Sequence, residues 1–186
     1  ATPRYWTCAI LLDHTTAVIC GGYDGKKILA SCESLDLTTH TFSPFPDMLE
    51  PRSEHAGVHY DGTIVVLGGF DQSTCEQFDS AAGQWTAFSP LNQGRDSFGA
   101  AVVEGKIYVV AGGSDAVEVY DGSAWSVVTQ LPRTRPIGSA VALGGKLVVL
   151  GGFIEEIDVF DPASNCWSPL PKMIQARREY HAVVSF

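Results

Sequence analysis

This sequence has few basic residues. Only 12 of its 186 residues are lysine or arginine, against 21 aspartates and glutamates, which gives a formal net charge of -9. An acidic protein is repelled by a phosphate backbone, and the sequence contains no basic cluster that would offset that repulsion. We therefore expect no nucleic-acid partner.

Long apolar runs and disulfide-like cysteine patterns are also missing. No apolar stretch approaches the ~20 residues that cross a bilayer, and the first residues lack the basic, apolar and small-residue order of a signal peptide. The cysteines are odd in number and include no CxxC pair: Cys8, Cys20, Cys32, Cys75 and Cys166. This pattern favours reduced, buried thiols over disulfides or a zinc site. We expect a soluble cytoplasmic protein with no membrane partner.

The short motifs of common enzymes are absent as well, since no GxSxG, HExxH, P-loop or dinucleotide fingerprint occurs. His55 and His59 share one side of a predicted strand, with His181 in the matching place of the last repeat. A metal site there is an alternative interpretation. We expect no cofactor, no metal and no catalytic residue.

Glycine and proline are plentiful and spread along the chain. The 19 glycines and 10 prolines leave no window for a long amphipathic helix, so the expected class is all-β. A chain of this length fits one domain and can bury ~70% of the surface that its unfolded form exposes.

Four apolar runs each end in a pair of glycines. The pairs are Gly21 and Gly22, Gly68 and Gly69, Gly112 and Gly113, and Gly151 and Gly152. Their first members are 47, 44 and 39 residues apart, which is the repeat length of a propeller blade. Each pair is followed by an acidic residue in a strand-like phrase that ends in aspartate: ESLD, EQFD, EVYD or DVFD. These aspartates predict turns, and we assign the acidic residues Glu33, Glu76, Glu118 and Asp158 to structural hydrogen bonds.

An aromatic residue and an arginine complete each repeat. The aromatic residues are Phe42, Trp85, Trp125 and Trp167. The arginines that begin the next repeat are Arg52, Arg95, Arg135 and Arg178, and Arg4 takes the same place at the start. The fourth residue after each arginine is small, which is typical of the crowded inner strands of a radial array, and the large aromatic is expected to pack between neighbouring sheets.

The order of arginine, small residue, double glycine, acidic phrase and tryptophan resembles the kelch repeat. The phrase GGYDGKKILASCESLD is similar to the repeats of kelch-like proteins, which also contain BTB and BACK regions. The resemblance implies an all-β kelch β-propeller over residues 1–186, with four four-stranded antiparallel blades, as a small propeller or a fragment of a larger one. The expected repeats are 4–51, 52–94, 95–134 and 135–177. Residues 178–186 form a surplus inner strand, which either begins a further blade or replaces the other terminal inner strand. If it begins a further blade, its unpaired edge predicts self-association.

Strand order predicts that the loops after the double glycines and the loops before the inner strands lie on one face. The candidate partner-binding residues on it are Arg52, Arg95, Arg135, Arg178, Tyr23, Phe70, Asp71, Ser114, Phe153 and Tyr180. Two interpretations of the arginines stay open. Each guanidinium donates to carbonyls of a neighbouring loop, or it binds a carboxylate or carbonyl of a partner.

Kelch-like proteins hold peptide segments of their partners on this face, so the resemblance implies a protein-interaction module. Substrate recognition for a cullin-based ubiquitin ligase and cytoskeletal scaffolding are the two roles that it suggests. The arginines favour an acidic or carbonyl-rich partner, whereas four nearby carboxylates favour a basic one: Asp71, Asp96, Asp115 and Glu179. The alternative function is a small propeller enzyme that handles a sugar or uses a copper or iron site.

Overall fold

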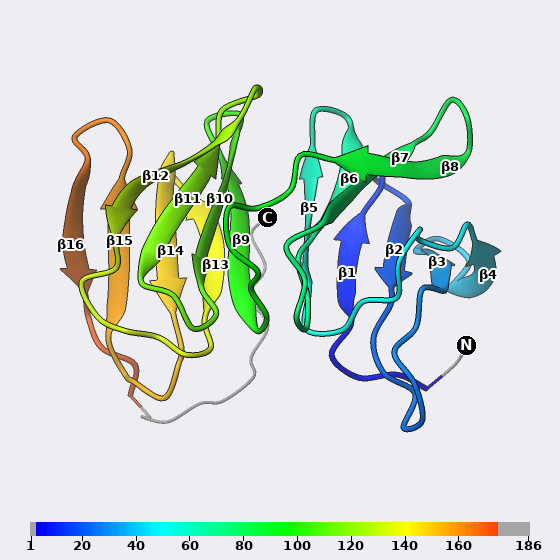
Figure 1. Cartoon of the computed structure of the whole chain (residues 1–186), viewed down its shortest axis with the longest axis horizontal. Coiled ribbons are helices and arrows are strands. Elements are labelled where there is room, and N and C mark those ends of the chain that lie inside the picture. The colour runs from blue at the N-terminus through cyan, green and yellow to red at the C-terminus, as the bar shows by residue number, and fades with distance from the viewer. Residues whose placement is uncertain (1–2, 175–186) are drawn as a thin grey trace. The chain divides into compact units, whose positions relative to one another are not determined.

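A computed structural model describes residues 3–174 of the chain. Sixteen strands form four four-stranded antiparallel sheets, and in every sheet the strands follow one another in chain order (Figure 1). This confirms the predicted all-β class and its four kelch-type blades. The described part of the chain contains no helix long and apolar enough to cross a membrane.

The sequence predicts one domain, and the structure groups the chain into two compact units, Ala1–Asp96 and Ser97–Phe186. The first unit contains blades 1 and 2. Blade 1 consists of β1 (Cys8–Leu11), β2 (Thr16–Cys20), β3 (Cys32–Asp36) and β4 (Thr41–Phe45). Blade 2 consists of β5 (Ala56–Tyr60), β6 (Thr63–Leu67), β7 (Cys75–Asp79) and β8 (Gln84–Phe88).

The second unit contains blades 3 and 4. Blade 3 consists of β9 (Phe98–Val103), β10 (Lys106–Ala111), β11 (Ala116–Tyr120) and β12 (Trp125–Gln130). Blade 4 consists of β13 (Ser139–Leu143), β14 (Lys146–Leu150), β15 (Ile157–Asp161) and β16 (Cys166–Leu170). Each blade falls within one predicted repeat. The surplus strand predicted for residues 178–186 lies outside the described residues.

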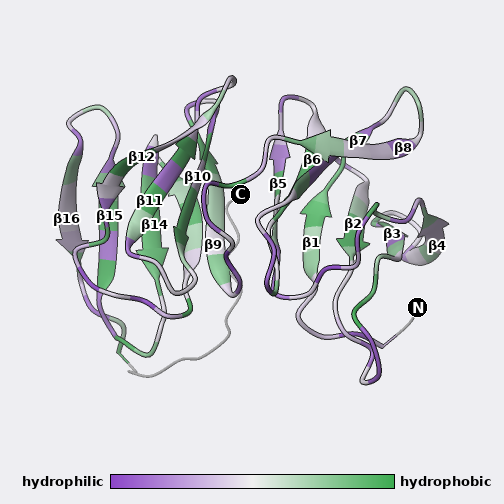
Figure 2. Ribbon diagram, viewed as in Figure 1, coloured by the Kyte–Doolittle hydropathy of each residue, from purple (hydrophilic) through white to green (hydrophobic). Residues whose placement is uncertain are grey.

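The second strand of a blade is its most apolar element, because both of its faces are covered. All side chains from Ile64 to Leu67 in β6 are fully buried, as are Val109, Val110 and Ala111 in β10. The outermost strands β4 and β16 are largely exposed and more polar. Figure 2 shows this gradient of hydropathy in the second unit, from β14 to β16. A short continuous apolar run is the pattern expected of a strand buried on both faces.

The second strand of each blade ends just before the double glycine, because the glycines leave the extended conformation. Gly21 has a φ of 60° and Gly152 has a φ of 77°. A Cβ at Gly21 would lie 2.5 Å from the carbonyl oxygen of Arg52, and one at Gly152 would clash with the carbonyl oxygen of Ile137. Only glycine fits beside these loops, which is the close approach that the repeat pattern suggests.

The aspartates that end the third strands form the predicted turns. Asp79 accepts hydrogen bonds from the backbone N–H groups of Ala81 and Ala82 at 2.9 and 3.0 Å. Asp121 has the same arrangement and also accepts the Ser123 hydroxyl, and these donors lower its pKa to about 2. The turns join the outer strands of the blades.

Two of the three repeat tryptophans, Trp85 and Trp167, contact a neighbouring blade or the segment that follows it within the same unit, as the repeat pattern predicts. Trp85 is 3% exposed and its indole N–H donates to the carbonyl of Pro46, which follows blade 1. Trp167 is half-buried and donates to Thr129 of β12. Trp125 is buried beside Tyr120. Phe42, at the same repeat position in blade 1, is 48% exposed.

Candidate functional site

Arg52, which begins the second repeat, is held inside blade 2. The Arg52 side chain is fully buried and donates to the carbonyl oxygens of Gly68 and Thr74, both at 2.7 Å. Its Nε and Nη2 reach one carboxylate oxygen of Glu76 at 3.1 and 2.9 Å. The guanidinium therefore joins the double glycine, the loop after it and the acidic residue of the third strand.

The same bridge recurs in blades 1 and 4. Arg135 donates to the carbonyl of Gly151 at 2.6 Å, to that of Glu156 at 2.8 Å and to Asp158 at 2.7 Å. In blade 1 the Arg4 guanidinium binds the carbonyls of Gly21 and Ser31 at 2.9 and 2.7 Å and lies 3.7 Å from Glu33. We call this arrangement the arginine bridge. The acidic residues Glu76 and Asp158 therefore have the structural role that the sequence predicts for them.

The arginine bridge favours the interpretation in which the guanidinium donates to loop carbonyls over the one in which it binds a partner. Arg52, Arg95 and Arg135 are 1%, 2% and 0% exposed, and the carbonyl groups that Arg52 and Arg135 bind belong to their own blades. A buried guanidinium that is already bound cannot offer donors to another molecule without breaking the loop that it holds. Arg178 and Tyr180 lie outside the described residues.

Three aromatic residues meet on the loops of blade 1. Tyr5 and Trp6 precede β1, and Tyr23 follows the double glycine after β2. The ring of Tyr5 lies edge-on to both others, with centroids 4.9 Å from Trp6 and 5.3 Å from Tyr23. The backbones of Tyr5 and Tyr23 exchange two hydrogen bonds at 3.1 and 2.8 Å. Tyr5 is nevertheless 48% exposed and Trp6 43% exposed.

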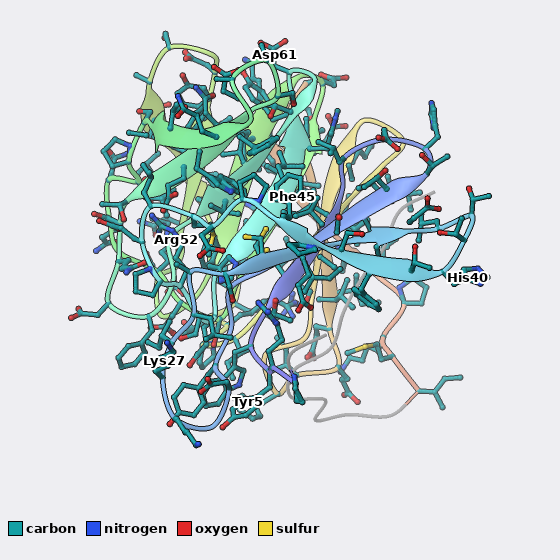
Figure 3. All side chains as sticks on the ribbon, turned by 90° about the vertical axis from the view of Figure 1, so that its right-hand side faces the viewer. Tyr5, Lys27, His40, Phe45, Arg52 and Asp61 are labelled. Carbon is teal, nitrogen blue, oxygen red and sulfur yellow. The ribbon has the colours of Figure 1, made fainter. Side chains whose placement is uncertain are left out.

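Phe70, in the corresponding loop of blade 2, is tied to these residues by the backbone. Glu54 N–H donates to the carbonyl of Trp6, and Phe70 N–H donates to the carbonyl of Ser53, both at 2.9 Å. Phe70 is 57% exposed. We call Tyr5, Trp6, Tyr23 and Phe70 the aromatic surface of the first unit. Figure 3 shows Tyr5 and Lys27 at one end of this unit and Asp61, in the β5–β6 turn, at the other.

The backbone beside the aromatic surface adopts the left-handed region at residues other than glycine. Trp6 and Glu54 both have a φ of 58°, and Asp71 has the same value. This conformation is uncommon for a bulky side chain and costs free energy unless the surroundings impose it. Trp6 and Glu54 both stand two residues after a bridge arginine. Sequence reasoning missed this position because the residues that occupy it share no chemical type.

Carboxylates occur on the same group of loops as the aromatic surface. Glu54 and Asp96 are partly exposed on the loops before inner strands, and Asp71 is exposed next to Phe70. The pKa of Asp96 lies above its ordinary value because burial penalises the carboxylate and because the negative charge of Glu54 is near. Two lysines, Lys26 and Lys27, are exposed in the loop after Tyr23.

The second unit presents the candidates Ser114 and Phe153 on its own loops. Phe153 is 41% exposed, follows the double glycine of blade 4 and has a φ of 68°. The Ser114 hydroxyl accepts the backbone N–H of Ala116 at 3.3 Å and so shapes the loop before β11. Phe153 is thus the exposed aromatic residue of this unit that corresponds to Phe70.

The two histidines that the sequence places on one side of a strand differ in exposure, and His55 lies just before β5. His55 is 7% exposed and its Nε2 lies 3.1 Å from the sulfur of Cys8, whereas His59 is exposed. Within residues 3–174, no three or more histidine, cysteine, aspartate or glutamate side chains are grouped so that they could hold a metal ion.

A hollow of about 320 Å³ lies along the outer strands of blade 1. Arg4, Glu33 and the exposed ring of Phe42 contribute to its lining. In the second unit a smaller hollow of about 270 Å³ lies beside Tyr108 and Phe160. Neither hollow contains the candidate partner-binding residues.

Comparison with known proteins gives a consistent result. Residues 9–49, 51–92 and 138–174 match the Kelch motif. Kelch-like protein terF of Aspergillus terreus is 31% identical over 166 residues, which cover 72% of this chain and 36% of that protein. Kelch-like protein 40 of Xenopus laevis is 32% identical over 124 residues, which cover 60% of this chain and 20% of that protein. Human Kelch-like protein 41 is 37% identical over 101 residues, 44% of this chain and 17% of that protein. The chain therefore spans well under half the length of these relatives.

Proposed function

Because this chain belongs to the kelch-repeat family, we propose that it is a protein-interaction module that binds a segment of a partner protein on the aromatic surface of its first unit. The observation that carries this proposal is the exposure of Tyr5, Trp6 and Phe70 on loops that backbone hydrogen bonds hold in place. Tyrosine and tryptophan dominate the binding energy of protein interfaces, and rings that are already held lose little entropy when a partner binds.

The partner segment is proposed to be basic and apolar. The sequence left the sign of the charge open, and the positive interpretation depended on arginines that the structure buries against Glu76 and Asp158. Three exposed or partly exposed carboxylates lie on the loops of this surface, Glu54, Asp71 and Asp96, whereas the two exposed lysines lie in one loop after Tyr23. Lysine or arginine side chains of a partner would lie near these carboxylates and beside aromatic faces, where cations are attracted.

A peptide library selected on the purified chain tests this proposal. Selected peptides should be enriched in lysine or arginine next to an apolar residue, and their affinity should fall as salt rises because exposed charges are screened. Trp6→Ala and Phe70→Ala should each weaken binding by about 1–3 kcal/mol.

The matched control is Leu11→Ala, which removes an exposed apolar side chain, 56% exposed, at the opposite end of β1. It should leave the affinity unchanged. Equal losses from Leu11→Ala and Trp6→Ala, with the fold intact by circular dichroism, would place binding elsewhere. Selection of acidic peptides would overturn the proposed charge.

The finer proposal concerns what becomes of the partner. Substrate recognition for a cullin-based ubiquitin ligase and cytoskeletal scaffolding both use such a module. The amount of partner protein in cells distinguishes the two roles. Removal of the chain from cells should make a ligase substrate accumulate. A scaffolded partner should keep its level and change its location.

A further inference from the structure

Three cysteines lie side by side across blade 1. Cys8 in β1 is paired with Cys20 in β2, and Cys20 is paired with Cys32 in β3. Side chains opposite each other on antiparallel strands point to the same face, with Cβ atoms ~4.5–5.5 Å apart. A disulfide needs Cβ atoms ~3.5–4.5 Å apart and Cα atoms ~4.4–6.8 Å apart, so a small approach suffices to join Cys20 to either neighbour.

His55 reaches this row of thiols from the segment just before blade 2. Its Nε2 lies 3.1 Å from the sulfur of Cys8, and its Cε1 lies against Gly21. The imidazole is 7% exposed, and its Nδ1 has no hydrogen-bond partner among the residues that the structure describes. A histidine beside a thiol stabilises the thiolate, which is the form of cysteine that reacts with electrophiles and oxidants.

The three thiols are not equivalent. Cys20 and Cys32 are buried, while Cys8 is the member of the row that is partly exposed. The pKa of Cys8 lies well below its ordinary value, because the Cys20 thiol donates to its sulfur and because His55 lies beside it. The pKa of Cys20 is raised, and the Cys32 thiol donates to the carbonyl of Ala30 at 3.6 Å. Cys8 is thus the nucleophile of the row, and Cys20 is the protonated thiol next to it.

We propose that Cys8 is a hydroperoxide-reactive cysteine and that Cys20 converts its oxidised form into a disulfide between β1 and β2. The Cys8 thiolate attacks one oxygen of a hydroperoxide, ROOH, so that an S–O bond forms and the O–O bond breaks. The departing alkoxide takes up a proton and leaves as ROH. Cys8 loses two electrons to the peroxide and becomes a sulfenic acid.

The second step closes the disulfide. The Cys20 thiol gives up its proton and its sulfur attacks the sulfur of Cys8. The S–O bond breaks, and the hydroxyl group leaves with that proton as water. The net change is the loss of two thiol hydrogens from the protein and the reduction of one peroxide to an alcohol and water. A dithiol reductant reverses it.

Treatment of the purified chain with hydrogen peroxide tests the proposal. Peptide mapping by mass spectrometry should find Cys8 joined to Cys20, and the disulfide should disappear after reduction. Cys20→Ser should stop the reaction at the sulfenic acid, so that dimedone labels Cys8. Cys8→Ser should prevent both products. Cys166→Ser is the matched control, because Cys166 is exposed on β16 of the second unit, and it should leave the Cys8–Cys20 disulfide unchanged.

The role of His55 is tested by comparing the alkylation rates of two cysteines in the same protein. In His55→Gln, alkylation of Cys8 by iodoacetamide should slow at least about tenfold relative to alkylation of Cys166, because less of Cys8 is thiolate. A variant that only loosened blade 1 would accelerate Cys8 instead. An unchanged ratio, a disulfide between Cys20 and Cys32, or oxidation of Cys166 while Cys8 stays reduced would each overturn the proposal.

Discussion

Arg52 has a fully buried side chain and still satisfies its guanidinium, because its loop carbonyls and Glu76 are arranged around it. Glu76 also accepts the backbone N–H groups of Leu49 and Glu50, which belong to the segment after blade 1. One buried ion pair therefore links the end of blade 1 to two loops of blade 2. Such a pair costs desolvation to form, and it is most damaging when only one partner is removed.

Arg52→Ala should accordingly destabilise the protein by about 3–5 kcal/mol, since it leaves the Glu76 carboxylate buried without its counter-charge. Urea denaturation at pH 7 measures this free energy of unfolding. Lys27→Ala, which removes an exposed cation from the same unit, is the control and should leave the value unchanged. Similar losses from both variants would contradict the structural role of the arginine bridge.

Substitution of Asp96 should have the opposite effect from that of Arg52, because it should stabilise the folded protein. Its pKa is raised in the folded protein by burial and by Glu54, so its contribution to stability is present below its unfolded pKa of about 4 and is lost as pH rises through the folded value. Asp96→Asn should therefore raise the melting temperature at pH 7, with the difference from the unmodified chain vanishing below about pH 4.

The same substitution should weaken the binding of basic peptides. Greater stability with lower affinity is the outcome expected when carboxylates are held together for a partner. A destabilised Asp96→Asn variant at pH 7 would show that this carboxylate has a favourable partner in the fold.

At the scale of elements, the aromatic residue of the fourth strand is buried in one blade and exposed in another. Trp85 in β8 is buried and donates to Pro46 of the preceding segment, whereas Phe42 in β4 is exposed beside the hollow of blade 1. The aromatic residue stabilises the protein where another blade covers it. Removal of this aromatic side chain should therefore lower the free energy of unfolding by different amounts in blades 1 and 2.

We expect Trp85→Ala to cost about 3–5 kcal/mol, as other large-to-small changes in a core do. Phe42→Ala should cost less than about 1 kcal/mol, because a half-exposed ring has less contact to lose. Chemical denaturation followed by circular dichroism compares the two variants directly. A loss at Phe42 as large as that at Trp85 would mean that another part of the protein covers blade 1.

At the scale of the whole molecule, the net charge of -9 opposes association between copies of the chain at low salt. The surplus strand predicted for residues 178–186 would favour association despite this repulsion, because an unpaired edge can form hydrogen bonds with another copy of the chain. We predict that the chain self-associates at high concentration and that raised salt promotes it. Sedimentation should show this association, and deletion of residues 178–186 should abolish it. A strictly monomeric chain would contradict the prediction.

The sequence by itself determined the class of fold, the four repeats within this chain and the order of the strands in each blade. The reason is that each of these depends on short patterns repeated along the chain: an apolar run, a double glycine, an acidic phrase and an aspartate turn. Gly21 and Gly152 adopt a positive φ, which is a local requirement of the backbone, so the pattern that it imposes is visible without coordinates.

Only the tertiary structure decided which recurring residues face inward. Arginine and glutamate have the same sequence pattern whether they bind each other or a partner, and the choice depends on carbonyls such as those of Gly68 and Thr74, which lie far along the chain from Arg52. The contact of His55 with Cys8 joins residues of two blades and has no local signal. Exposure, charge and thiol reactivity are set by such distant neighbours, because burial and electrostatic fields depend on distance in space and not on distance along the sequence.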